Sequence, residues 1–189
     1  SRLSRGLGDV YKRQALLQFH QPVFSTEDTV SQAVARYLTR IHKYMEDEDW
    51  INAKRELEVT ARRYFKNEDS YERALINQLY GQFYALQRDY KNAIPWFEKA
   101  VAKGRLPFAA DLQVSYSLAQ CYFQTGRYKD VIATLENYRD KASKRGQNMA
   151  PIQLMLLGIA YYQEQDTLNA YLNIAEANAT ATKLNEEWL

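Results

Sequence analysis

Hydrophobic and polar residues follow a helical period over most of the chain from residue 34 onward. Two stretches show it best, ALINQLYGQFYALQ at 74–87 and PIQLMLLGIAYYQE at 151–164. Apolar residues that recur three or four positions apart indicate amphipathic α-helices. Short polar segments interrupt the pattern at 46–49, 87–89, 124–127 and 163–166. The pattern therefore predicts pairs of helices in which a short turn joins the two members.

One set of residues recurs four times along the chain. In each copy a tyrosine is followed nine residues later by a small or branched residue, and four residues after that by a larger apolar one. Successive tyrosines are 40, 38 and 39 residues apart. The repeated positions are Tyr44, Ala53 and Leu57; Tyr84, Ala93 and Phe97; Tyr122, Val131 and Leu135; and Tyr161, Ala170 and Ile174. Self-similarity at a fixed period is typical of repeat proteins, so we expect about four helix pairs over residues 34–180.

Small residues precede three of these tyrosines by one helical turn. They are Gly81, Ala119 and Gly158. Because residues three apart share a helix face, a small residue there lets the second helix of a pair approach the first closely. Asp49, Asp89 and Asp166 stand directly before the second helices, where an aspartate caps free backbone N–H groups. The spacing thus predicts close helix pairs, with the tyrosine ring packed over the contact.

The order of these residues resembles the tetratricopeptide repeat (TPR). The second copy shows it most clearly, with Gly81, Tyr84, Ala93, Phe97 and a closing Pro107. The resemblance implies an all-α fold, an α-solenoid of stacked helix–turn–helix repeats. It also implies a non-catalytic scaffold that binds a protein or peptide partner on its concave face.

A narrower resemblance concerns the segments QPVFS (21–25), YERALINQLYGQFYALQRDYKNAI (71–94) and NEEWL (185–189). Together they resemble the TPR accessory protein found beside TonB energy-transduction systems in Gram-negative bacteria. That resemblance implies a periplasmic location and TonB or Exb-type proteins as partners. The alternative is another kind of bacterial repeat protein.

The two ends of the chain differ from the repeats. Residues 1–14 resemble a translated sequencing adapter, and we expect them to be non-native; the alternative is a basic targeting arm, although the apolar core of a secretory signal is lacking. Residues 15–33 are expected to lead into the first helix. Residues 181–189 are expected to begin a further helix that is cut off. The apolar face left on the last helix pair then predicts self-association or fraying.

Charge and composition exclude several functions. The first fourteen residues hold four basic and one acidic residue, which leaves 21 basic and 22 acidic residues elsewhere, so we expect no nucleic-acid partner. No apolar run approaches the roughly 20 residues of a membrane span, so we expect no direct membrane insertion. One cysteine and two histidines are too few for a structural zinc site. We therefore expect no metal, no cofactor and no enzyme activity.

Two features of the sequence are candidates for a catalytic site or a metal site, and each has a structural interpretation. Cys121, with His20 or His42, has the elements of a nucleophile and base, but it directly precedes Tyr122 and is interpreted as a buried small side chain. The acidic run 46–49 aligns with the interhelical turns and is interpreted as a turn. The alternative function is a substrate-recruiting repeat region of a larger enzyme whose catalytic part lies outside this chain.

A candidate peptide-binding groove follows from the first helix of each pair. Positions three, four and seven residues apart face away from the predicted contact, and those selected are Gln78, Gln82, Tyr116, Gln120, Phe123, Met155, Ile159 and Tyr162. None is charged. Glutamine amides bond a peptide backbone and aromatic rings hold its side chains. The alternative is that Phe123, Met155 and Ile159 are buried between neighbouring helices. Tyr116 is expected to be more exposed than Phe123.

Overall fold

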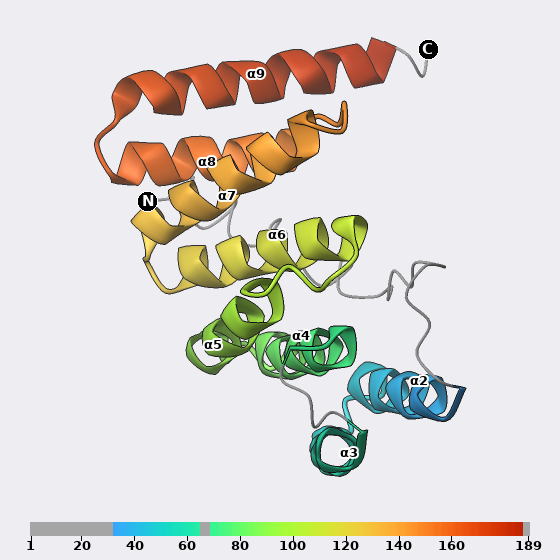
Figure 1. Cartoon of the computed structure of the whole chain (residues 1–189). Helices are drawn as coiled ribbons and strands as arrows, with labels where there is room; N and C mark the ends of the chain where they lie inside the picture. Colours follow the sequence, from blue (N-terminus) through green and yellow to red (C-terminus); the bar gives the residue numbers. More distant parts are fainter. Residues whose placement is uncertain (1–31, 65–68, 187–189) are drawn as a thin grey trace. The chain divides into compact units, whose positions relative to one another are not determined.

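The computed structural model describes residues 32–64 and 69–186 of the 189-residue chain (Figure 1). These residues form eight α-helices and no strand, which confirms the all-α prediction. The helices are α2 (Gln32–Glu46), α3 (Trp50–Tyr64), α4 (Tyr71–Leu86), α5 (Tyr90–Val101), α6 (Phe108–Gln124), α7 (Tyr128–Ser143), α8 (Pro151–Gln163) and α9 (Thr167–Glu186). The predictions for residues 1–14 and for most of the lead-in 15–33 lie outside the described residues.

The chain divides into two compact units. The N-terminal unit is residues 1–117 and the C-terminal unit is residues 118–189, so that the boundary lies within α6. In the N-terminal unit, α2 packs on α3 and α4 packs on α5. In the C-terminal unit, α7 packs on α8, and α8 packs on α9. Three of these contacts, α2 on α3, α4 on α5 and α8 on α9, join helices that the sequence pattern pairs.

The turns between paired helices share one geometry. In each turn the carbonyl oxygen of the repeated tyrosine accepts the backbone N–H of the fifth residue after it. These bonds join Asp49 to Tyr44 (2.8 Å), Asp89 to Tyr84 (2.9 Å), Arg127 to Tyr122 (2.9 Å) and Asp166 to Tyr161 (3.0 Å). The residue before the donor has positive φ in all four, at Glu48, Arg88, Gly126 and Gln165. Only Gly126 adopts that conformation without a steric cost, so the shared turn geometry overrides local preference at the other three.

Aspartates cap the second helices of three pairs, as expected. Asp49, Asp89 and Asp166 accept the backbone N–H of the third following residue at 3.1, 3.3 and 3.1 Å. That residue is an asparagine each time, and its amide donates to the other carboxylate oxygen. In the remaining turn Arg127 stands at the capping position of α7 and makes no side-chain cap hydrogen bond. Its Nε donates instead to Asp130 at 2.7 Å.

Glycines bring α4 against α5 and α8 against α9. A Cβ atom on Gly81 would lie 2.5 Å from the ring of Phe97, and one on Gly158 would lie 2.7 Å from Cγ1 of Ile174. Both distances are shorter than van der Waals contact. Of the other repeated positions, Ala53, Leu57, Ala93, Phe97, Ala119, Tyr122, Val131, Leu135 and Ala170 are buried, while Tyr44, Tyr84, Tyr161 and Ile174 are half-buried.

The last helix is longer than its sequence pattern suggests. Residues 181–186, expected to begin a separate helix, continue α9 as far as Glu186, and residues 187–189 lie outside the described part. No glycine or proline interrupts this stretch, and the hydroxyls of Thr180 and Thr182 donate to the carbonyl oxygens of Glu176 and Asn178 within the helix. The prediction of a new helix at 181 is therefore wrong. None of the described helices is long and apolar enough to span a membrane.

Candidate partner-binding surface

Three of the predicted groove residues belong to the N-terminal unit and are buried. Gln78 and Gln82 on α4 are 6% and 3% exposed, and Tyr116 on α6 is 4% exposed. The expectation that Tyr116 is more exposed than Phe123 is wrong, because Phe123 is only half-buried. The error comes from treating α4 and α6 as helices with one buried face, whereas residues 74–79 and 114–119 are buried on every side.

The α4 amides, Asn77, Gln78 and Gln82, share an unusual property. Each side chain is more than nine-tenths buried, yet its carbonyl oxygen has no hydrogen-bond partner among the described residues. Leaving a buried polar group unpaired costs about 1–3 kcal/mol. Such groups in native proteins usually mark a water or ligand that completes them. The described residues thus supply no hydrogen-bond donor to the carbonyl oxygens of the α4 amides.

The other five predicted groove residues lie in the C-terminal unit and are accessible. Gln120 and Phe123 on α6, and Met155 and Ile159 on α8, are half-buried, and Tyr162 is 63% exposed. The spacing from 155 to 159 to 162 places the three α8 residues on one helix face. The alternative of full burial for Phe123, Met155 and Ile159 does not hold.

A pocket that the sequence pattern does not predict lies between α3 and α4. Its volume is about 450 Å³, and its lining residues are Trp50, Ile51, Lys54, Arg55, Glu58, Phe83, Tyr84 and Gln87. Trp50 meets Phe83 edge to face with ring centroids 6.0 Å apart. Ile51, which lines the pocket, is 83% exposed. A large apolar residue at the start of a second helix is the sequence feature that could have indicated this pocket.

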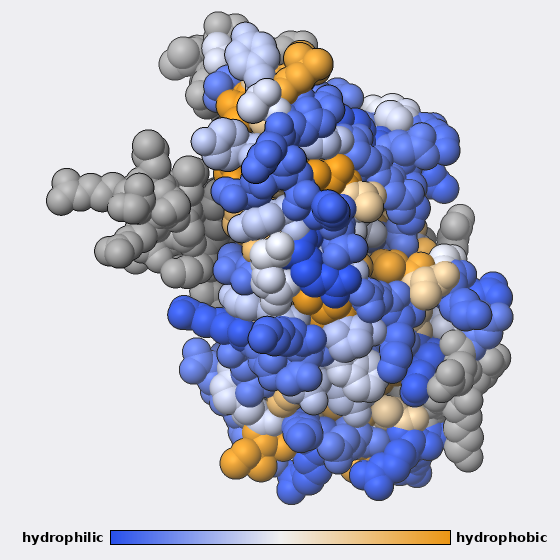
Figure 2. Space-filling view, turned by 90° about the vertical axis from the view of Figure 1, so that its left-hand side faces the viewer, coloured by the Kyte–Doolittle hydropathy of each residue, from blue (hydrophilic) through white to orange (hydrophobic). Residues whose placement is uncertain are grey.

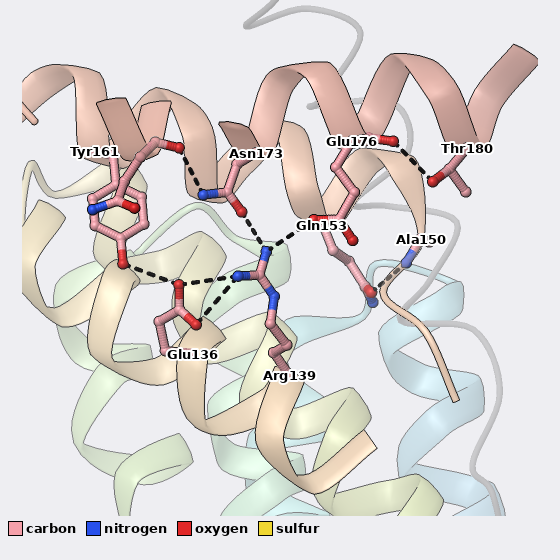
Figure 3. Close-up of polar contacts among 9 residues, drawn as sticks. Glu136, Arg139, Ala150, Gln153, Tyr161, Asn173, Glu176 and Thr180 are labelled. Carbon is pink, nitrogen blue, oxygen red and sulfur yellow. Dashed lines mark hydrogen bonds and ion pairs between the residues drawn. The ribbon is translucent and has the colours of Figure 1, made fainter. Parts of the chain in front are cut away.

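A network of polar contacts joins α7, α8 and α9 in the C-terminal unit (Figure 3). We call it the Arg139 network; its members are Glu136, Arg139, Tyr161, Asn173 and Glu176. Arg139 donates to Oδ1 of Asn173 and to Glu136 at 3.3 Å, and forms an ion pair with Glu176 at 3.6 Å. The Tyr161 hydroxyl donates to Glu136 at 3.0 Å. Burial and this hydrogen bond raise the pKa of Tyr161 to about 12, so the hydroxyl keeps its proton.

Every polar group at the centre of the Arg139 network is used. Asn173, 4% exposed, accepts from Arg139 and donates to the carbonyl oxygen of Asn169 at 2.8 Å. Sequence reasoning missed this cluster, although the pair Glu136 and Arg139 at three-residue spacing was a usable signal. Its hydrogen bonds and ion pairs connect α7 with both α8 and α9 and so fix the register of the three helices.

Cys121, the candidate nucleophile of the sequence analysis, is buried. Burial raises the pKa of the Cys121 thiol to about 12, which leaves almost no thiolate nucleophile at neutral pH. No group of three or more metal-ligating side chains occurs among the residues that the structure describes. His20, one of the two histidines considered as a base for Cys121, lies outside the described residues. Figure 2 shows a largely hydrophilic face on which apolar side chains are scattered.

Known proteins resemble the chain in part of its sequence and in its fold. A family model described as "Anaphase-promoting complex, cyclosome, subunit 3" matches residues 86–150. The crystal structure of BtubC (BKLC) from P. vanneervenii is similar, with a TM-score of 0.69 and 17% identity over 96% of this chain and 74% of BtubC. The crystal structure of PilW, a widely conserved type IV pilus biogenesis factor, matches with a TM-score of 0.33 and 16% identity over 81% of this chain and 96% of PilW. No curated protein matches by sequence.

The helix pairs, their repeated turns and the BtubC match define the class of fold. It is an all-α, TPR-like helical-repeat solenoid, as the sequence pattern predicts. Such arrays stack small helical units and offer extended surfaces to other proteins.

Proposed function

We propose that the chain is a non-catalytic scaffold that binds an extended or helical segment of a partner protein along the first helices of its pairs. The observation that carries the proposal is the accessible, uncharged face of α8, formed by Met155, Ile159 and Tyr162. A peptide-binding groove needs apolar side chains at helical spacing that remain accessible and are not buried in the core. These three residues meet that condition.

The residues of this surface have different roles in the proposed binding. Tyr162 on α8 and Phe123 on α6 supply rings large enough to anchor a partner's side chains. Gln120 supplies an amide for the partner's backbone. Because the surface carries no charge of its own, binding depends only weakly on salt concentration.

The narrower proposal is a periplasmic accessory of a TonB system that binds TonB or an Exb-type protein. It is supported by the resemblance of residues 71–94, which form α4 and the beginning of α5. The competing proposal, a recruiting region of a larger enzyme, uses the same surface for a substrate protein. A pull-down from a Gram-negative periplasmic extract separates them, because recovery of TonB or Exb-type proteins supports the accessory role and an exclusively cytosolic set contradicts it.

A peptide selection tests the proposed surface. Phage-displayed random 12-residue peptides are selected on the immobilised chain, and the best peptide is titrated by calorimetry. Tyr162→Ala should weaken its binding about 30-fold, since truncating an aromatic anchor costs about 2 kcal/mol. Tyr171→Ala is the matched control, because Tyr171 on α9 is similarly exposed, at 70% against 63%.

Equal binding by the parent and Tyr162→Ala contradicts the surface assignment. So does an equal loss in both variants, because Tyr171 lies outside the surface. Binding that falls more than tenfold when NaCl is raised from 50 to 500 mM contradicts the uncharged mode of recognition.

A further inference from the structure

One side of α9 exposes a row of apolar side chains. Leu168, Tyr171 and Leu172 are 67%, 70% and 52% exposed. The opposite side of α9, with Ala170 and Asn173, is buried and packs against α8 (Figure 1). Among the described residues of the C-terminal unit, nothing covers the outer side.

The side chains on this outer face change in size along α9. Its members are Leu168, Tyr171, Leu172, Ala175, Ala179 and Thr182, all exposed and at steps of one, three or four residues. The first half carries large side chains and the second half carries small ones. None of the six is charged, so a second face of the same kind meets no like-charge repulsion.

We propose that this face binds a second copy of the chain, with the two α9 helices antiparallel about a two-fold axis at Ala175. In that arrangement Leu168 of each copy lies opposite Thr182 of the other, and Tyr171 lies opposite Ala179. At these two pairs a large side chain lies opposite a small one, which a parallel arrangement does not achieve. The self-complementary pattern is what an isologous dimer interface requires.

The proposed contact is small. Four turns of one helix bury less than the roughly 800 Å² per partner of a standard stable interface. The dimer is therefore weak and depends on concentration, and a single charge on its face is enough to prevent it. This inference concerns a different surface from the proposed groove and stands independently of it.

Alanine at the crossing point lets the helices approach closely. With helix axes about 8–10 Å apart and Cα atoms about 2.3 Å from each axis, the two Ala175 Cα atoms lie about 3–5 Å apart. A disulfide joins Cα atoms about 4.4–6.8 Å apart, so cysteines at this position are within reach. Thr182 is seven residues from the axis, which places its two copies about 21 Å apart.

Light scattering after size-exclusion chromatography is the first test. The parent chain should double its molar mass between about 5 and 500 µM, as expected for a weak dimer. Tyr171→Glu should remain monomeric over that range with an unchanged melting temperature. Asn137→Glu is the control, since it adds the same charge to an exposed position on α7 and should dimerise like the parent.

Cysteine cross-linking tests the orientation. Under mild oxidation Ala175→Cys should form a disulfide-linked dimer, and Thr182→Cys should form at least tenfold less. The native Cys121 gives a low background, because it is 1% exposed and burial raises its pKa to about 12.

Two results overturn the proposal. A monomer at every concentration means that this face of α9 does not bind a second copy of the chain. Equal cross-linking at 175 and 182 means that the association is parallel or unspecific. Neither result bears on the proposed peptide-binding surface, which is tested separately by the peptide affinity of Tyr162→Ala.

Discussion

Two groups of buried polar side chains, one in each unit, differ in how they are satisfied. The α4 amides of the N-terminal unit have carbonyl oxygens without partners among the described residues. In the Arg139 network of the C-terminal unit, Asn173 is buried to the same degree but both donates and accepts. The difference separates an amide that joins helices through its hydrogen bonds from amides whose carbonyl oxygens receive no hydrogen bond from the described residues.

The packing around the two groups is otherwise alike. Gly81 admits Phe97 beside the α4 amides, and Gly158 admits Ile174 beside Asn173. The same aspartate–asparagine cap begins both second helices, α5 and α9. The contrast between the units therefore lies in their polar partners and not in how their helices pair.

The largest expected effect tests this shared packing. Gly81→Leu and Gly158→Leu should each lower the free energy of unfolding by about 1–3 kcal/mol or more, because even a Cβ atom overlaps the facing helix. Ala109→Leu and Ala133→Leu are matched controls at exposed helical positions, one in each unit. Urea denaturation provides the measurement. Tolerance at one glycine only would mean that the two units pack by different rules.

A smaller effect concerns the caps. Hydrogen bonds from Asn52 and Asn169 lower the pKa values of Asp49 and Asp166 below 3.8. A carboxylate with a lowered folded-state pKa stabilises the fold above its unfolded pKa, and that contribution is lost as the pH falls through the folded value. Asn52→Ala or Asn169→Ala should therefore move the acid-unfolding midpoint to higher pH. A circular-dichroism titration from pH 6 to 2 should show similar, small shifts for both variants, and a shift in only one of them would contradict the equivalence of the caps.

The sequence predicted the helix pairs well because their signals are local and repeated. The aspartate cap acts within one turn, and the small residue faces the next helix in the chain, so the repeated spacing is enough to predict the roles of Asp89 and Gly81. The end of α9 was misplaced because a weakly patterned stretch such as 178–182 continues a helix when nothing breaks it.

The candidate site was harder to predict because accessibility depends on packing between repeats. Helical spacing places Gln82 and Tyr162 on comparable faces, yet one is 3% and the other 63% exposed. The Arg139 network joins residues up to 37 positions apart in the chain, from Arg139 to Glu176, and no local pattern records such a contact. Which polar groups lack a partner is likewise a property of the folded chain.

Matched substitutions of two buried amides test the central claim most directly. Asn173→Leu removes an acceptor of Arg139 and should lower the free energy of unfolding in urea by about 1–3 kcal/mol, because it leaves a partly buried charge underpaired. Gln82→Leu removes an amide whose carbonyl oxygen has no partner among the described residues and should leave that free energy unchanged within about 0.5 kcal/mol, or raise it. An equal loss of 1 kcal/mol or more in Gln82→Leu would contradict the account, since it would show that the α4 amides stabilise the fold as much as Asn173 does.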